Sequence, residues 1–134
     1  ATASLILNET TSVGKGLRIL IAEDNPVNMM VESDYLESKG YEIIGVGNGA
    51  EAIELAQKHQ PDLILMDIQM PGMDGLEATR RLRLLPEFAS VPIIALTALA
   101  MSGDRERCLE AGANEYMAKP FSLKALDEML ENLL

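Results

Sequence analysis

Five polar side chains in this sequence have the chemistry to bind a metal ion and a phosphoryl group, and each follows a short, mostly apolar run. They are Glu23, Asp24, Asp67, Thr97 and Lys119. Carboxylates packed at ~4 Å repel each other by roughly 4 kcal/mol per pair at an effective dielectric of about 20, so three acids need a counter-charge. Oxygen ligands without a neighbouring histidine or cysteine favour Mg²⁺ as that counter-charge.

The same residues could divide the work of phosphoryl transfer. While some carboxylates hold the ion, one remains free to act as a nucleophile that forms an aspartyl phosphate, and Asp67 is the central candidate. Lys119 and Thr97 could contact the phosphoryl oxygens through a charge and a hydroxyl hydrogen bond. Taken singly, each residue is more simply explained as a turn residue, a helix cap or a surface charge. The hypothesis therefore depends on their meeting at one place.

Short strands alternate with helices along the chain, and this alternation would bring the five residues together. The run Leu63–Met66 is uninterrupted and apolar, which is typical of a strand covered on both faces. An alternating pattern with short connections predicts a parallel sheet with right-handed crossovers and helices on both faces. The residues that follow the strands then share one edge of the sheet. The predicted strands are residues 17–22, 41–46, 63–66, 91–96 and 115–118.

Capping residues mark the start of three predicted helices. Asn25 before Pro26 is an N-cap followed by proline at the first helical position, while Asn48 and Asp74 cap the next two helices. The first of these helices ends near Gly40. It carries an apolar stripe, interrupted by Asp34, that is formed by Val27, Met30, Val31, Tyr35 and Leu36.

The last two predicted helices differ in how firmly they should be held. Residues 102–111 form a polar helix with a thin apolar stripe, closed by Gly112, so we expect it to be loosely held. The helix at the end of the chain has the strongest apolar stripe, formed by Leu123, Leu126, Met129, Leu130 and Leu133.

Length and charge limit the classes of protein to which the chain could belong. Its 134 residues suit one domain, with residues 1–16 as a linker and residues 17–134 as the folded part. A net charge of -10 disfavours direct nucleic-acid binding. The single cysteine, Cys108, cannot form an internal disulfide, and no apolar run reaches ~18 residues. We therefore expect a soluble cytoplasmic domain without membrane contact.

Several other residues call for no chemistry. His59 is expected at the surface near a helix end, and Cys108 as a small buried or half-buried side chain. Arg80, Arg81 and Arg83 are expected to form a solvated basic face. Two other folds fit poorly, because a Rossmann half-domain needs a glycine fingerprint after its first strand and an eight-stranded barrel needs roughly 250 residues.

From residue 17 to residue 134, the chain resembles the receiver domain of two-component response regulators. The resemblance is specific because five separate signals agree. They are Glu23-Asp24, Met66-Asp67 with Met70-Pro71-Gly72-Met73-Asp74-Gly75, Ala95-Leu96-Thr97-Ala98, Tyr116, and Lys119-Pro120-Phe121. It implies an α/β, flavodoxin-like (CheY-like), doubly wound five-stranded parallel sheet in the order 2-1-3-4-5.

The resemblance also implies roles for individual residues. Asp67 would be the phosphoacceptor, and Asp24 and Asp67 would bind Mg²⁺, with Mn²⁺ as a possible substitute, together with the backbone carbonyl of Gln69. Glu23 would act mainly through ordered water, Thr97 and Lys119 would contact the phosphoryl group, and Lys119-Pro120 would be a cis peptide. Tyr116 would follow Thr97 in a switch of the face built by the fourth helix, fifth strand and fifth helix. Gln69 and Leu99 resemble positions that tune hydrolysis.

The implied partner is a histidine kinase or a histidine phosphotransfer domain, and a homodimer or a contact with a kinase in the same chain is possible. Such a domain acts on no outside substrate and catalyses only its own phosphorylation and dephosphorylation. The segments Glu23–Asn28 and Gly103–Cys108 are similar to receivers attached to hybrid histidine kinases. With the missing initiator methionine and the linker, they favour a module from a hybrid sensor kinase over a stand-alone regulator.

Three other functions compete with the phosphoacceptor. A degenerate receiver that only docks partners is disfavoured because no site residue is missing. A flavin-binding protein of this fold would need Ser, Thr or Gly after the first strand, where Glu23 and Asp24 stand. A metal-dependent phosphatase acting on outside substrates would need a second general acid near Asp67, yet residue 69 is glutamine.

Overall fold

A five-stranded parallel sheet forms the centre of the protein, with the strand order β2-β1-β3-β4-β5. The computed structural model describes residues 16–98 and 101–134, so the predicted linker lies almost wholly outside the described residues. The order confirms the flavodoxin-like prediction, and the predicted strand limits are correct to within two residues. The strands are β1 (Arg18–Ala22), β2 (Glu42–Val46), β3 (Leu63–Asp67), β4 (Ile93–Thr97) and β5 (Glu115–Ala118).

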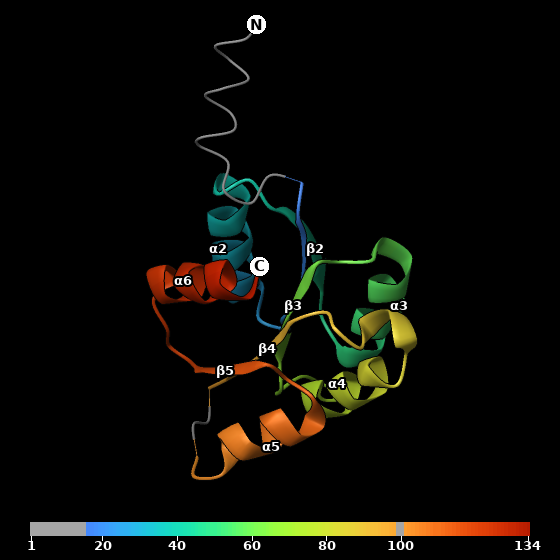
Figure 1. The fold of residues 1–134 in the computed structure, drawn as a ribbon. Coiled ribbons are helices and arrows are strands. Elements are labelled where there is room, and N and C mark those ends of the chain that lie inside the picture. The colour runs from blue at the N-terminus through green and yellow to red at the C-terminus, as the bar shows by residue number, and fades with distance from the viewer. Residues whose placement is uncertain (1–15, 99–100) are drawn as a thin grey trace, which may run out of the picture.

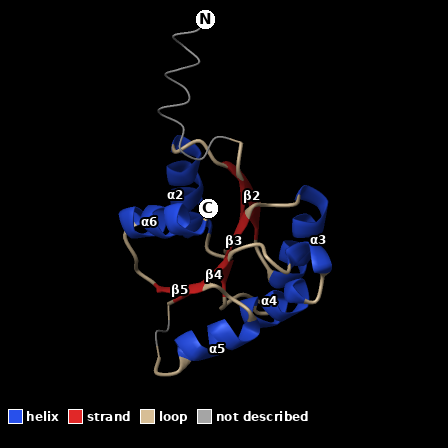
Figure 2. Cartoon of the chain, in the orientation of Figure 1, coloured by secondary structure: helices blue, strands red, loops and turns tan. Residues whose placement is uncertain are grey.

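Helices cover both faces of the sheet, as Figure 1 shows. One face carries α2 (Pro26–Ser38) and α6 (Leu123–Leu133). The other face carries α3 (Gly49–His59), α4 (Gly75–Arg83) and α5 (Asp104–Ala111), with the short 3₁₀ helix η1 (Pro86–Phe88) after α4. Figure 2 shows the same three layers by element type. In the described part of the chain, none of these helices is long and apolar enough to cross a membrane.

The core has two layers because neighbouring strand residues point to opposite faces of the sheet. Ile19 and Leu65 pack toward α2 and α6, while Leu20 and Ile64 pack toward the other three helices. All residues of β3 are buried. The central strand that carries Asp67 is therefore covered on both faces, as its apolar composition predicts.

The predicted caps begin the predicted helices. The side chain of Asn25 accepts hydrogen bonds from the backbone N–H groups of Val27 and Asn28 at 2.9 and 3.0 Å. Asn48 and Asp74 each accept one N–H bond in the same way. The predicted helix over residues 102–111 begins two residues later than expected, because Gly103 adopts a left-handed conformation with a φ of 90°.

The apolar stripe of the first helix is only partly buried. Val27, Met30 and Val31 are 62%, 57% and 45% exposed, whereas Glu32 and Leu36 are only 5% and 0% exposed. The sheet lies against the face that holds residues 32 and 36, one turn apart on the helix. The apolar pattern alone does not assign the buried face of this helix, because α2 has apolar residues on both sides.

The prediction of a solvated basic face is also wrong for one of its three members. Arg83 is half-buried, and its guanidinium donates to the backbone carbonyls of Gly112, Phe88 and Val91 at 2.6–2.8 Å. It also donates to the side chain of Asn114 at 2.8 Å. Burial lowers the pKa of Arg83 from its ordinary value. Its planar set of donors satisfies several carbonyls at once, which ties α4 to the end of α5.

Candidate functional site

The carboxyl ends of four neighbouring strands bring the predicted residues to one edge of the sheet. Asp67 is the last residue of β3, and Thr97 is the last residue of β4. Glu23 and Asp24 directly follow β1, and Lys119 directly follows β5. The parallel register places Ala22 beside Met66, Asp67 beside Leu96, and Thr97 beside Ala118, so these ends are level with one another.

The three predicted acids form one cluster at this edge. One carboxylate oxygen from each of Glu23, Asp24 and Asp67 lies within 4.8 Å of the others. Glu23 and Asp67 are 3% and 4% exposed, whereas Asp24 is exposed to solvent. A cluster with two buried members and one exposed member is open to an ion from one side only.

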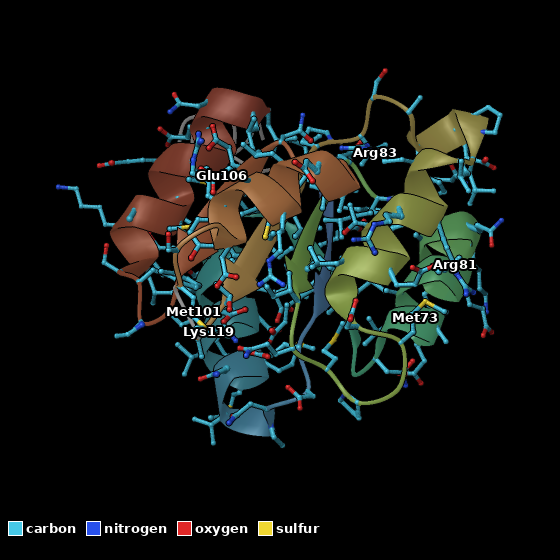
Figure 3. The ribbon with its side chains drawn as sticks, turned by 90° about the horizontal axis from the view of Figure 1, so that it is seen from below. Met73, Arg81, Arg83, Met101, Glu106 and Lys119 are labelled. Atoms are coloured by element: carbon cyan, nitrogen blue, oxygen red, sulfur yellow. The ribbon has the colours of Figure 1, made fainter. Side chains whose placement is uncertain are left out.

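Lys119 provides the counter-charge within the protein itself. Its ammonium nitrogen Nζ lies 2.5 Å from Oε1 of Glu23 and 2.9 Å from Oδ2 of Asp67. Burial raises the pKa of Glu23 to about 7, and the neighbouring Asp67 adds to this rise while Lys119 opposes it. Burial alone would lower the pKa of Lys119, but its bonds to Glu23 and Asp67 outweigh that effect and raise the pKa above its ordinary value. Figure 3 shows Lys119 beside α2 in the view from below.

The donor atoms of the cluster fit a hard divalent cation. The second carboxylate oxygen of Glu23, Oε2, is buried and has no hydrogen-bond partner among the described residues. Buried acceptors in proteins normally have a donor or a cation beside them. Carboxylate oxygens without nitrogen or sulfur ligands suit Mg²⁺, which binds through one or two carboxylates and retains several waters.

Gln69 links the end of β3 to the end of β4. Its backbone N–H donates to Oδ1 of Asp67 at 2.8 Å. Its side-chain oxygen accepts hydrogen bonds from the backbone N–H of Ala98 at 3.1 Å and from the hydroxyl of Thr97 at 3.4 Å. The prediction for Gln69 concerned its backbone carbonyl, so this side-chain link was missed. Leu99, the other position predicted to affect hydrolysis, lies outside the described residues.

The turn after β3 depends on Gly75, the first residue of α4. A Cβ atom at this position would lie 2.2 Å from the carbonyl oxygen of Asp67 and 2.8 Å from the Cα of Ile68. Only glycine therefore permits α4 to begin this close to the end of β3. The loop of residues 68–74 therefore ends beside the residue at which it began, and the N–H of Gly75 donates to the carbonyl of Ile68 at 3.3 Å.

Thr97, Tyr116 and the peptide bond before Pro120 complete the predicted set. Thr97 is fully buried, and its carbonyl accepts the backbone N–H of Lys119 at 2.7 Å. Tyr116 is half-buried on β5 beside Ala95 and packs against the core layer under α3, α4 and α5. The predicted cis peptide between Lys119 and Pro120 is confirmed.

Sequence reasoning missed one acidic residue near this edge, Glu32 of α2. Glu32 lines a cavity of about 480 Å³ that Lys119 also lines. A signal was present in the sequence, because Glu32 and Leu36 are four residues apart and therefore share a helix face. Leu36 is fully buried, so an acid one turn before it was a candidate for burial.

Comparison with known proteins agrees with this geometry. Residues 19–131 match the family model of the response regulator receiver domain. The polar-differentiation response regulator DivK of Brucella anthropi is 46% identical over 116 residues, which cover 87% of this chain and 94% of that protein.

Solved structures give the same result. The receiver domain of the sensor histidine kinase PA1611 of Pseudomonas aeruginosa, with a magnesium ion coordinated in its active-site cleft, is 47% identical with a TM-score of 0.82. The similarity covers 88% of this chain and 97% of that domain. The chemotaxis protein CheY4 of Vibrio cholerae is 29% identical with a TM-score of 0.84, over 88% of this chain and 98% of that protein. The chain therefore belongs to the receiver domains of two-component response regulators.

Proposed function

We propose that this receiver domain accepts a phosphoryl group from a phosphohistidine onto Asp67. The observation that carries the proposal is the contact of Lys119 with Asp67, at 2.9 Å, within a cluster of three carboxylates. An aspartate at the open edge of the sheet, beside a fixed cation, combines a nucleophile with electrostatic stabilisation of the charge that develops during transfer.

In the proposed transfer, the bond between phosphorus and the imidazole nitrogen breaks, and a bond from phosphorus to a carboxylate oxygen of Asp67 forms. The electron pair of the broken bond returns to the imidazole, which takes a proton from solvent. Oδ1 of Asp67 is oriented by the N–H of Gln69, and Lys119 lies on the side of Oδ2. Lys119 and Thr97 would then hold two phosphoryl oxygens by charge and by a hydroxyl hydrogen bond.

We propose Glu23, Asp24 and Asp67 as the residues that hold Mg²⁺, together with the backbone carbonyl of Gln69. Support comes from the 4.8 Å cluster and from the unpartnered Oε2 of Glu23. It comes also from the magnesium ion in the PA1611 receiver. When bound, the ion supplies positive charge that neutralises the acids and the incoming phosphoryl oxygens. Replacement of Mg²⁺ by Mn²⁺ is a separate proposal, tested by adding each ion to the metal-free protein.

We further propose that the signal passes from Thr97 to Tyr116 and changes the face built by α5, β5 and α6. A phosphoryl group on Asp67 would draw the Thr97 hydroxyl away from the side chain of Gln69, whose bond of 3.4 Å is long and weak. The half-buried ring of Tyr116 would then turn inward on β5. Fluorine NMR of protein labelled with 3-fluorotyrosine tests this step, with the Tyr116 signal assigned through Tyr116→Phe, because a ring that moves inward changes its chemical shift on phosphorylation.

The partner in this proposal is a histidine kinase or a histidine phosphotransfer domain. The relatives include a stand-alone response regulator and receivers of sensor histidine kinases, so both kinds of parent protein are represented. We propose that residues 17–134 form the receiver and that residues 1–16 link it to a hybrid sensor kinase. Phosphotransfer profiling against purified candidate kinases would identify the donor, and size-exclusion chromatography of the phosphorylated chain would detect a homodimer.

Phosphorylation by a small donor tests the central proposal directly. Incubation with acetyl phosphate and Mg²⁺ should add one phosphoryl group to the wild type, as seen by intact-protein mass spectrometry. Asp67→Ala should add none, and chelation of Mg²⁺ should prevent the reaction in the wild type. Asp34→Asn, which alters an exposed acid of α2, is the matched control and should behave as the wild type. Unchanged incorporation in folded Asp67→Ala would refute the assignment, and no incorporation in the wild type would favour the degenerate docking module.

A further inference from the structure

The side chain of Glu32 is a buried acceptor that nothing in the described part of the chain satisfies. Glu32 is 5% exposed, and its oxygen Oε1 has no hydrogen-bond partner there. Buried acceptors without donors are rare in folded proteins because desolvation of the group is not repaid. Glu32 also lines a cavity, although Oε1 itself is covered, so a donor from outside reaches this oxygen when the carboxylate turns toward the cavity.

The cavity lies between α2 and the loop that joins β5 to α6. Its volume of about 480 Å³ is in the range of small-molecule sites. Apolar side chains form much of its wall, among them Val31, Pro120, Phe121 and Leu123. Such walls suit the aliphatic part of a ligand, while Glu32 provides a single polar anchor.

The charges around the cavity select the sign of the ligand. The negative charges of Glu23 and Asp67 disfavour ionisation of Glu32 and raise its pKa, whereas the positive charge of Lys119 favours ionisation and lowers it. Lys119 is already bonded to Glu23 and Asp67 at 2.5 and 2.9 Å, so its charge is shared by those two acids. With Asp24, four carboxylates lie around one ammonium, so even with one Mg²⁺ bound the region would have a net charge of -1 when all four are ionised, which repels anions and attracts cations.

We propose that this cavity is a binding site for an organic cation, an alkylammonium or guanidinium group on a short aliphatic stem, with Glu32 as the acceptor. The cation would donate N–H to the Glu32 carboxylate, turned so that an oxygen faces the cavity, and its stem would lie against Val31, Phe121 and Leu123. The site adjoins the acid cluster, because Lys119 lines the cavity and also bonds to Glu23 and Asp67, and it requires no phosphorylation. The cation has two possible sources, a free amine or the basic side chain of another protein.

The test compares butylguanidinium with butylurea, its neutral isostere, by titration of the ¹⁵N-labelled full chain in saturating Mg²⁺. Butylguanidinium should shift the backbone amide signals of residues 31, 32, 121 and 123. It should also bind about tenfold more tightly than butylurea, as expected for a charge-assisted hydrogen bond. Glu32→Gln should remove this difference while leaving butylurea binding unchanged, and Glu37→Gln, an exposed acid of the same helix, should retain it.

A second readout is the pKa of Glu32 itself. Burial, and secondly the charge of Glu23, raise this pKa to about 7. A bound cation favours the ionised carboxylate, so butylguanidinium should lower the pKa, as followed by the ¹³C signal of the carboxyl carbon during a pH titration. Butylurea should leave the pKa where it is.

A pair of peptides distinguishes the two sources of the cation. One peptide presents arginine between two alanines, and the other presents citrulline, the urea analogue of arginine. Tighter binding of the arginine peptide than of free butylguanidinium indicates a protein side chain, and weaker binding indicates a free amine. Equal affinities of butylguanidinium and butylurea, an unchanged difference in Glu32→Gln, or shifts confined to residues 23, 24 and 67 would each overturn the proposal.

Discussion

Two helical flanks border the acid cluster, and each contains a buried acid in a different condition. On the flank formed by α4 and α5, Asp104 is 2% exposed and accepts hydrogen bonds from the backbone N–H of Met101 and from the side chain of Arg107. On the flank formed by α2 and α6, Glu32 is 5% exposed and has an oxygen that no described residue satisfies. Both acids line a cavity, of about 200 Å³ at Asp104 and about 480 Å³ at Glu32, but Asp104 has donors beside its carboxylate whereas one oxygen of Glu32 has none among the described residues.

The pKa values of the two acids follow from this difference. The bond from Met101, and secondly the one from Arg107, lower the pKa of Asp104. Burial, with Glu23 in second place, raises the pKa of Glu32 to about 7. A carboxylate stabilised by donors strengthens the fold when it is ionised, whereas an unpartnered one weakens it.

The two flanks also differ in the polar contacts that join their helices. Arg83 joins α4 to the end of α5 and to the segment before β4 through four hydrogen bonds. Between α2 and α6, Lys39 forms an ion pair with Asp127 at 3.8 Å, and the Lys39 side chain is 39% exposed. Exposed pairs of this length contribute little stability. The α4–α5 flank is therefore held by more hydrogen bonds, whereas α2 and α6 are held mainly by the core layer that contains the buried Leu36, Leu126 and Leu130.

Removal of the Lys119 ammonium should have the largest effect on the free energy of unfolding. Lys119→Met leaves Glu23 and Asp67 buried without a counter-charge, which should reduce the free energy of unfolding by about 4 kcal/mol at about pH 8 in metal-free buffer. Urea unfolding measures the change, and Lys124→Met, at an exposed position of α6, is the control. Added Mg²⁺ should restore part of the loss. Equal stability of the two variants would mean that Lys119 does not neutralise the cluster.

The protein should become more stable when the unpartnered charge of Glu32, on the α2–α6 flank, is removed. Glu32 has a pKa of 4.5 in the unfolded chain and about 7 in the folded one, so folding retains a proton between these values and loses stability as the pH rises through them. Relative to the wild type, Glu32→Gln should therefore gain about 3 kcal/mol between about pH 4.5 and about pH 8. Unfolding curves of both proteins across this range, with metal removed, give the difference. A difference that stays constant with pH would show that Glu32 is not the titrating group.

The protein should lose stability when the guanidinium of Arg83, on the α4–α5 flank, is removed. Arg83→Met leaves the carbonyls of Gly112, Phe88 and Val91 without this donor, and the free energy of unfolding should fall by about 2 kcal/mol. Arg80→Met is the matched control, because Arg80 is exposed and, among residues 16–98 and 101–134, pairs with Glu77 of the same helix alone, so its loss should stay below about 0.5 kcal/mol. If both variants lost the same amount, Arg83 would be a surface residue as the sequence analysis expected.

The smallest effect, opposite in sign to that of Glu32→Gln, is expected at Asp104. Asp104→Asn replaces a carboxylate that accepts from Met101 and Arg107, so the melting temperature at neutral pH should fall. The pKa of Asp104 is lower in the folded chain than in the unfolded one. Its ionised carboxylate therefore stabilises the fold at a pH above the unfolded pKa, and this stabilisation is lost as the pH falls through the folded pKa. Calorimetry at neutral and acidic pH measures it, with Asp34→Asn as the control. A rise in the melting temperature would mean that Asp104, like Glu32, is a strained acid.

The predictable part of the site is the part that follows from strand order. Asp67, Thr97 and Lys119 each stand at the end of a short apolar run, and parallel strands bring such ends to one edge whatever the side chains between them. The N-caps Asn25 and Asp74 were predictable for a related reason, since a cap acts only on N–H groups two or three residues away. Local composition was sufficient in both cases.

The sequence by itself determined the alternation of strands and helices, the sheet order expected of the family, and the edge at which the acids meet. Only the tertiary structure decided which face of α2 is buried and that Arg83 enters the space between α4 and α5. It also decided that Gln69 contacts Asp67 through its backbone N–H and Thr97 through its side chain. These features depend on which elements are neighbours in space. A helix with apolar residues on both sides, or an arginine near distant carbonyls, adopts its contacts only once the sheet and its other helices are in place.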